Sequence, residues 1–162
     1  MAIVAPVSKY KIKTFRIYIA FCVIVAAIFA YDGYLSKYEW SYRYSSFYTK
    51  HFIDKGNKPD GDMVFNQKAP PCIVGVAVLL GIYLFVIRNR KVVAEDNGLV
   101  IDGKTSIPYD SVQKIDKTNF DKKGHFTFTY KTPDGKEVDR KISERDYDNL
   151  KAILDHLVAK IS

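Results

Sequence analysis

The sequence has few of the residues from which covalent and metal-bound frameworks are built. Among its 162 residues are only two cysteines, two methionines and three histidines. Two cysteines cannot form the dense disulfide framework of a small secreted module. Cys22 and Cys72 stand one in each of two apolar segments, at depths that differ by roughly 15 Å if these segments are antiparallel helices. We therefore expect two free cysteines that serve as small apolar packing residues.

Signatures of catalysis and cofactor binding are missing as well. No glycine-rich phosphate loop, nucleophile elbow or paired-carboxylate motif occurs in the sequence. His51, His125 and His156 are isolated, and the topology that the charges predict divides them between the two sides of a membrane, so they cannot gather around a metal. We predict no catalytic, cofactor-binding or metal-binding residues and no small-molecule substrate. The protein is expected not to be an enzyme.

Apolar and charged residues are segregated along the chain, which is 48% apolar and 27% charged. Residues 17–35 and 69–87 are each 19 long and contain a single charged residue, Asp32. A helix of this length spans roughly 28 Å, which matches the hydrocarbon core of a bilayer. We expect an integral membrane protein with transmembrane helices at 17–35 and 70–87. Pro70-Pro71 suit the first turn of the second helix.

A cleaved signal peptide is an alternative interpretation of the first apolar segment, since basic residues precede it. Cleavage after Ala30 would place Ile28 where a small residue is needed, and the apolar run is long for a signal. Orientation follows from the lysines and arginines close to the spans. They cluster before the first span and after the second, as Lys9, Lys11, Lys13, Arg16, Arg88, Arg90 and Lys91. Residues 1–16 are thus a basic N-terminal segment, and both termini are expected to be cytoplasmic.

Small residues four positions apart occur on each span and predict close helix packing. They are Ala26 and Ala30 on the first span and Ala77 and Gly81 on the second. We expect the spans to pack against each other or against a partner helix. Asp32 lies three residues from the end of its span. It is interpreted as a carboxylate at the level of the headgroups, in preference to a residue of a transport pathway.

The extracytoplasmic segment 36–69 is rich in aromatic residues interleaved with charges. Between Tyr34 and Phe52 this pattern predicts an amphipathic helix at the membrane interface, ended by Gly56, Pro59 and Gly61. The aromatic residues that could also contact a partner are Tyr38, Trp40, Tyr42, Tyr44 and Tyr48. Aromatic rings among bases can stack on nucleobases, but this segment faces away from the cytoplasm and carries six basic against four acidic residues. No nucleic-acid partner is expected.

Residues 91–162 change to a strand-like pattern with frequent turn signals. Asn97-Gly98 predicts a hairpin, and Phe126, Phe128 and Tyr130 alternate with threonines as in a half-buried strand. About six short strands can be placed. Ser143 is expected to cap a closing amphipathic helix that buries Tyr147 and a leucine stripe. The predicted fold class is α+β: a two-helix transmembrane hairpin and a small antiparallel sheet or barrel closed by a C-terminal helix.

The order of these elements resembles a bacterial pleckstrin-homology-like (PH-like) domain carried after two membrane helices. The stretch GLVIDGKTSIPYDSVQKID is similar to that family's glycine turn, short strand and following strand. Seven strands are usual in the family. The resemblance implies a domain for binding and assembly in the bacterial cytoplasmic membrane. The headgroup specificity of some eukaryotic relatives depends on a basic first hairpin, whereas here the tip carries Glu95-Asp96.

We therefore expect a membrane-anchored interaction or scaffold protein whose cytoplasmic domain docks to other membrane components. The alternative is an accessory, non-catalytic subunit of a larger membrane complex; a lipid-binding module or a small transporter is less favoured. Expected partners are the bilayer and other membrane proteins, or a second copy of the chain. A small basic tip at Lys117, Lys122 and Lys123 is a further candidate interaction surface, although Asp116 and Asp121 interrupt it.

Overall fold

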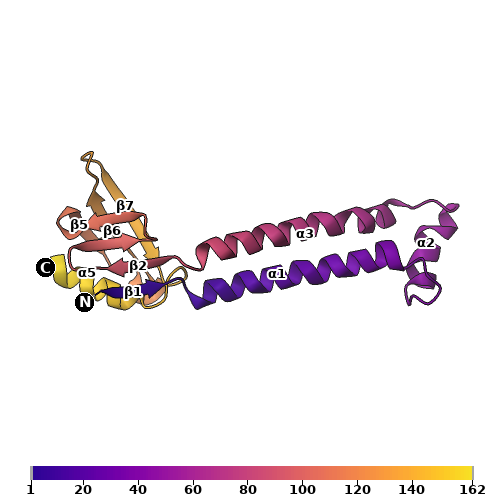
Figure 1. Ribbon diagram of the computed structural model, residues 1–162, viewed down its shortest axis with the longest axis horizontal. Coiled ribbons are helices and arrows are strands. Elements are labelled where there is room, and N and C mark those ends of the chain that lie inside the picture. Colours follow the sequence, from indigo (N-terminus) through magenta and orange to yellow (C-terminus); the bar gives the residue numbers. More distant parts are fainter. Residues whose placement is uncertain (1, 162) are drawn as a thin grey trace. The chain divides into compact units, whose positions relative to one another are not determined.

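The computed structural model describes residues 2–161, and the chain divides into two compact units. One unit contains the chain up to Thr14 together with everything from Leu84 onward, and the other is Phe15–Tyr83. The first unit therefore joins the two ends of the sequence, and Figure 1 marks both termini in the region of its strands.

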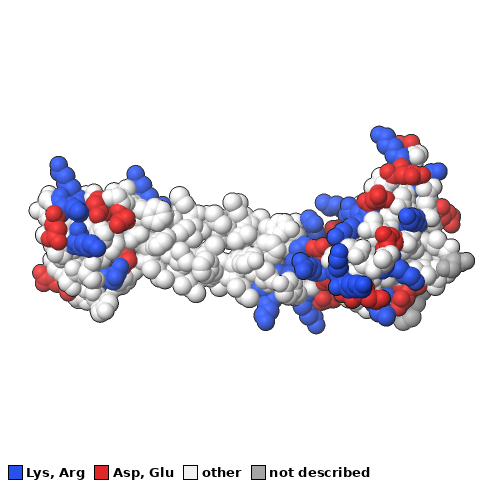
Figure 2. All heavy atoms as spheres, turned by 180° about the vertical axis from the view of Figure 1, so that it is seen from behind, with Lys and Arg blue, Asp and Glu red and all other residues white. Residues whose placement is uncertain are grey.

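Two long helices carry the apolar segments. Helix α1 is Lys9–Ala30 and is continued by a π-helical stretch, Tyr31–Leu35 (η1), while α3 is Gly61–Ile87. With η1 included, each helix has 27 residues and is long and apolar enough to cross a membrane. On the face that Figure 2 shows, the surface over the middle of the two helices carries no Lys, Arg, Asp or Glu. The helices begin well before the predicted spans, because the polar residues that precede each apolar run do not interrupt a helix.

Within Phe15–Tyr83, α1 and α3 run side by side as an antiparallel hairpin (Figure 1). The ring centroids of Phe15 and Tyr83 are 5.0 Å apart, and those of Phe29 and Phe65 are 5.5 Å apart. Each distance lies in the range of a favourable aromatic pair. One pair lies near each end of the hairpin, so the two helices are joined at both ends.

The expectation that Pro70 and Pro71 stand in a first helical turn is wrong. Both lie inside α3, ten and eleven positions into a helix that begins at Gly61. Proline has no amide hydrogen to give to the carbonyl four residues earlier, so the carbonyls of Asn66 and Gln67 lose their usual helical donors. The Tyr34 hydroxyl donates to the Gln67 carbonyl oxygen at 2.6 Å instead. This hydrogen bond from η1 therefore replaces one of the two backbone hydrogen bonds that the prolines remove from α3.

The segment between the helices is not the continuous amphipathic helix that was predicted from Tyr34 to Phe52. Turns follow Leu35, and helical structure returns in the π-helical stretch Tyr44–Tyr48 (η2) and the short helix α2, Thr49–His51. A 3₁₀ turn, Ile53–Lys55 (η3), ends at Gly56, which has a left-handed φ of 72°. Residues 31–60 form a compact segment, here called the cap. Polar side chains within it bond to one another, for example Ser41 to Tyr31 and His51 to Asp60.

Seven strands form two antiparallel sheets in the other unit. The first sheet has the order β1-β2-β3-β4 and the second β5-β6-β7. The strands are β1 Ile3–Pro6, β2 Lys91–Ala94, β3 Gly98–Ile101, β4 Thr105–Pro108, β5 Val112–Asp116, β6 His125–Lys131 and β7 Glu137–Ser143. A 3₁₀ turn at Tyr109–Ser111 (η4) joins the sheets, and α4, Phe120–Lys123, separates β5 from β6. The fold is thus α+β, and the described strands do not close into a barrel.

Strand β1 was not predicted, and it changes the domain boundary. Pro6 is the register partner of Lys91, and Ile3 is the partner of Ala94. Ala5 is fully buried in the hydrophobic core with residues of β2 and β3. The N-terminal segment is therefore an edge strand of the domain as well as a basic segment, and residues 91–162 alone are an incomplete unit.

The hairpin predicted at Asn97-Gly98 is present, and its glycine permits a close approach of two strands. Gly98 does not have a positive φ. A Cβ at this position would stand 2.6 Å from the Ile107 carbonyl oxygen, so the absence of a side chain allows β4 to approach β3. The left-handed pair is Asp102-Gly103, with φ values of 55° and 66°, between β3 and β4.

The closing helix α5 is Leu150–Ile161 and packs its apolar stripe into the core. Its fully buried members include Leu150, Ile153 and Leu157. Ser143 does not cap this helix, because it is the last residue of β7. Tyr147 precedes the helix and forms an isolated β-bridge with Val7. The residues between β7 and α5 therefore hold the N-terminal strand.

Candidate functional site

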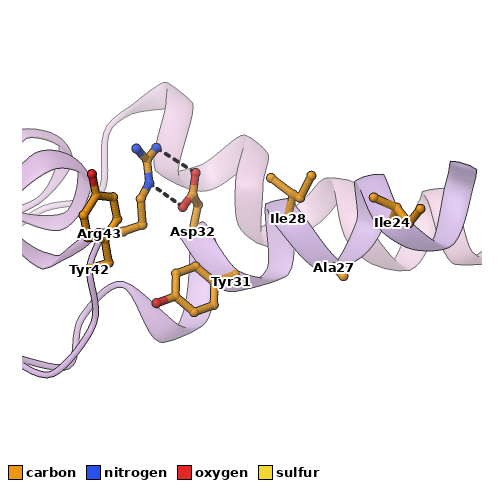
Figure 3. A pocket seen from close by; sticks show the side chains of 7 residues that line it. All are labelled: Ile24, Ala27, Ile28, Tyr31, Asp32, Tyr42 and Arg43. Carbon is orange, nitrogen blue, oxygen red and sulfur yellow. Dashed lines mark hydrogen bonds and ion pairs between the residues drawn. The ribbon is translucent and has the colours of Figure 1, made fainter.

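The cap of the helical hairpin is organised by an ion pair between Asp32 in η1 and Arg43 just before η2. Arg43 Nε donates to Oδ1 at 2.8 Å and Nη2 donates to Oδ2 at 2.9 Å. Figure 3 shows the two parallel contacts. The hydrogen bond to Asp32 raises the pKa of Arg43 above its ordinary value. Such two-point pairing fixes both the position and the plane of the guanidinium.

Beside this pair lies a hollow of about 680 Å³. It is lined by Ile24, Ala27, Ile28, Tyr31, Asp32, Tyr42 and Arg43. Figure 3 places the aliphatic residues along α1 and the paired charges with the tyrosines at one end. Because the charges neutralise each other, the hollow offers an apolar surface with a dipolar end. The carboxylate of Asp32, for which only an interfacial position was predicted, has a specific partner in the cap.

The end of the hairpin is held by a close backbone approach at Gly33. A Cβ on Gly33 would stand 2.6 Å from the Asn66 carbonyl oxygen, which is too close for any side chain. Gln67 Nε2 donates to the Gly33 carbonyl at 3.1 Å. Together with the bond from Tyr34 to Gln67, these contacts position Asp32 in the cap.

The small residues that were predicted to pack have unequal surroundings. Ala26 and Ala77 are buried, whereas Ala30 and Gly81 are partly exposed. A Cβ on Gly81 would meet no atom within 4 Å, so no close approach inside the described chain requires this glycine. Both cysteines are free, as expected.

The aromatic residues of the cap form small groups instead of one helical face. The rings of Tyr38 and Trp40 are stacked 5.6 Å apart, and Trp40 and Tyr42 are largely exposed, Tyr42 by 88%. Tyr44 and Tyr48 form a second, half-buried pair with ring centroids 5.6 Å apart. Only Tyr42 of these five lines the hollow beside Asp32.

The predicted basic tip is a surface of mixed charge. Lys117 shares a shallow recess with Asp121, Lys151 and Asp155. Lys122 and Lys123 share another with Asp121, Glu144 and Arg145. An anion at either recess would meet a carboxylate as well as an ammonium group. These lysines are exposed but do not form a site of one sign.

An acidic recess of about 510 Å³ lies at another turn of the domain, between the β2–β3 turn and the end of α5. Glu95, Asp96 and Asp110 line it together with Tyr109 and a single basic residue, Lys160. Tyr109 donates its hydroxyl to the Glu95 carbonyl oxygen at 2.8 Å. Burial, and then the charges of Asp96 and Glu95, raise the pKa of Tyr109. The recess therefore has a negative electrostatic potential.

A second group of titratable residues lies in the cap, where His51, Asp60 and Asp62 offer ligand atoms within 4.8 Å of one another. This group was not predicted, because the three histidines are isolated in the sequence and were considered only with one another. The sequence does contain a signal for it: His51 is followed, across a turn that contains Gly56, by two aspartates two positions apart, Asp60 and Asp62.

Comparison with protein-family models, curated proteins and solved structures finds no match to the chain.

Proposed function

We propose that the chain is a membrane-anchored interaction protein whose β domain recognises a basic segment of another membrane protein. The observation that carries this proposal is the acidic recess formed by Glu95, Asp96 and Asp110. Cytoplasmic segments next to membrane spans are rich in lysine and arginine. A domain anchored beside the membrane with an acidic recess is complementary to such segments.

Anchoring through α1 and α3 supports the proposal. Both helices have the length and apolarity that a membrane span needs, and each exposes many large aliphatic and aromatic residues along its apolar run. Because β1 pairs with β2, the segments that precede α1 and follow α3 must lie on the same side of any membrane that the hairpin crosses. The basic residues at these two ends favour the cytoplasmic side.

A PH-like architecture for the β domain belongs to the same proposal. The domain has a four-stranded sheet, a three-stranded sheet and a closing helix. Its seven strands match the number that is usual in that family, because β1 adds a strand to the six that the sequence predicted. In such domains the first hairpins commonly contact a ligand. Here the corresponding turn, Glu95–Asn97, is acidic, which favours a cationic peptide over an anionic lipid headgroup.

The test uses the full chain in native membranes, with a photoreactive amino acid at Ser106, an exposed residue that lines the recess. A second chain has the same probe at Asp134, which is exposed and lies outside the recess. We expect a cross-linked partner peptide rich in lysine and arginine from the Ser106 probe only. The combined substitution of Glu95→Gln and Asp110→Asn should remove this cross-link, and moderate salt should weaken it.

The matched control for the acidic residues is Asp121→Asn with Asp134→Asn, which removes the same charge at exposed positions outside the recess. If both double variants cross-link like the unmodified chain, the recess is not the docking site. Headgroup-selective binding of the protein to vesicles of anionic lipid would replace the proposal with a lipid-recognition function.

The exposed rings of Tyr38, Trp40 and Tyr42 favour the second candidate, an accessory subunit. Such rings are enriched both at membrane interfaces and at the centres of protein interfaces. The test replaces Trp40 and Tyr42 by serine and asks whether the protein still purifies with its membrane complex. If this variant loses the complex and the variant Glu95→Gln with Asp110→Asn keeps it, the accessory function is favoured over docking at the recess.

A further inference from the structure

We propose that His51, Asp60 and Asp62 form a binding site for a divalent transition metal ion of the zinc type, with the fourth position open to water. The three side chains converge on one point of the cap from two elements. His51 is the last residue of α2, Asp60 precedes α3 and Asp62 belongs to its first turn.

The ligand distances are close to those that a tetrahedral ion requires. His51 Nδ1 is 2.8 Å from Asp60 Oδ2 and 3.6 Å from Asp62 Oδ2. Zinc binds histidine nitrogen and carboxylate oxygen at about 2.0–2.2 Å, which places neighbouring ligand atoms roughly 3.4 Å apart in a tetrahedron. An opening of the His51–Asp60 pair by about half an ångström would bring these two ligand atoms to the tetrahedral spacing. All three ligand atoms lie within 4.8 Å of one another.

Two of the three ligands are held in place before any ion binds. The ring of His51 packs against Phe47, with centroids 4.5 Å apart, and Phe47 is itself buried. Asp60 Oδ1 accepts the amide hydrogen of Met63 at 3.0 Å, which leaves Oδ2 directed at the histidine. Asp62, whose side chain is 76% exposed, can adjust to the ion.

The charges also favour a dication. Two carboxylates and a neutral imidazole neutralise an M²⁺ ion. This compensates for the positive end of the α3 dipole, which by itself would repel a cation.

The donor set selects the class of metal. One imidazole nitrogen and two carboxylate oxygens suit Zn²⁺ and its neighbours, whereas Mg²⁺ and Ca²⁺ prefer six or more oxygen ligands. On binding, Nδ1 exchanges its hydrogen bond to Asp60 for a bond to the metal, and the imidazole proton is carried on Nε2. The ion would then tie α2 to the start of α3 across the turn at residues 52–59.

The test is calorimetric titration of the full-length, tag-free protein in detergent with Zn²⁺, and separately with Mg²⁺. We expect one Zn²⁺ per chain and much weaker binding of Mg²⁺. His51→Gln and Asp62→Asn should each lower the affinity for Zn²⁺ at least about tenfold, since even the loss of a ligand's hydrogen-bond partner typically costs ten- to hundredfold. His125→Gln and Asp54→Asn are the matched controls, because each removes the same functional group outside the site, and both should bind like the unmodified chain.

Equal affinity in the two site variants and the two controls would overturn the site. Loss of binding in His51→Gln with full binding in Asp62→Asn would overturn its three-ligand composition. The coordination geometry is checked independently with Co²⁺, whose visible absorption should appear in the unmodified chain and in both controls. Absence of the absorption in the unmodified chain would contradict tetrahedral binding.

Discussion

The hydroxyl of Tyr147 donates to Asp102 Oδ1 at 2.7 Å, across 45 residues of sequence. Arg90 Nη1 lies 3.7 Å from the other oxygen of the same carboxylate. Around this group, the Ser8 amide donates to the Asp146 carbonyl at 2.8 Å and Lys11 Nζ lies 2.6 Å from Asp146 Oδ1. The segment before α5 thus binds the β3–β4 turn on one side and the beginning of α1 on the other.

The first prediction concerns the minimal folded domain. A soluble fragment of residues 91–162 lacks β1 and exposes the surface that Ala5 and Val7 cover. The reference is a joined fragment, in which a short glycine-serine turn connects residues 1–8 to residues 88–162. The fragment without β1 should be the less stable of the two. The difference in the free energy of unfolding should be several kcal/mol, since two buried apolar side chains and a ladder of hydrogen bonds are lost. Urea unfolding of the two fragments measures it. Equal stabilities would show that β1 contributes nothing to the domain.

The second prediction is the effect of Tyr147→Phe in the joined fragment. The substitution removes a hydrogen bond to a charged group and should lower the free energy of unfolding by about 1.5–3 kcal/mol. Tyr130→Phe is the matched control, because it makes the same change on β6 and should be nearly neutral. A loss of stability as large in the control would show that the effect does not come from the bond to Asp102.

The third prediction is an alkaline loss of stability. Burial and the neighbouring Asp102 raise the pKa of Tyr147, and burial with nearby acidic charges raises that of Tyr109, both from an ordinary value of 10.0. Above pH 10 the unfolded chain has released protons that the folded chain still holds. The free energy of unfolding should therefore be unaffected by these groups below pH 10 and fall as the pH rises above it. The fall should be smaller in Tyr147→Phe, as unfolding at a series of pH values will show.

The fourth prediction uses the close approach of the helices. Gly33→Ala places a methyl group against the backbone of Asn66, which must shift, and should destabilise the hairpin by about 1–3 kcal/mol. Gly81→Ala meets no atom within 4 Å and is the matched control. Thermal unfolding in detergent should show a lower transition temperature for the first variant only. If Gly81→Ala has the larger effect, the small-residue spacing on the second span is the more important packing feature.

The fifth prediction concerns topology. In a background without Cys22 and Cys72, single cysteines at the exposed positions Ser46, Ala2 and Asp134 should differ in labelling by an impermeant maleimide on intact cells. Ser46 should be labelled, whereas Ala2 and Asp134 should both be protected, because β1 and the rest of its sheet share one compartment. Labelling of Asp134 without Ser46 would invert the orientation. Different results at Ala2 and Asp134 would contradict the pairing of β1 with β2.

The sequence predicted the elements whose signal is local. Apolar length indicated α1 and α3, and the alternation at Phe126 and Phe128 indicated β6. Strand β1 was missed because four residues carry no periodicity and their partner, Lys91–Ala94, lies beyond both long helices. The position of Pro71 was misjudged because proline is favoured at a helix start, whereas here a hydrogen bond from Tyr34 in η1 replaces the helical bond that Pro71 removes within α3.

Less of the candidate site could be predicted from the sequence, because its residues also meet only in the folded chain. Asp32 was correctly singled out as an unusual charge, but nothing in the sequence distinguishes Arg43 from the other basic residues of the cap as its partner. His51 and Asp60 meet only because the chain reverses at Gly56, and the details of such a turn depend on packing. The acidic turn at Glu95 was visible in sequence, while its closure into a recess by Asp110 and Lys160 required the tertiary fold.

The pairing of Pro6 with Lys91 also determines an order of events during synthesis. Most antiparallel strand pairs are joined by a short loop. Here 84 residues, including both apolar helices, separate the two partners. At typical rates of about 5–20 residues per second, β1 leaves the ribosome roughly 4–17 s before β2 exists. The first strand must wait unpaired while the helices are made, so the domain can be completed only after the hairpin has been synthesised. The hairpin is in effect an insertion between two neighbouring strands. A defect in placing it in the membrane would leave β1 and β2 each with an unpaired edge.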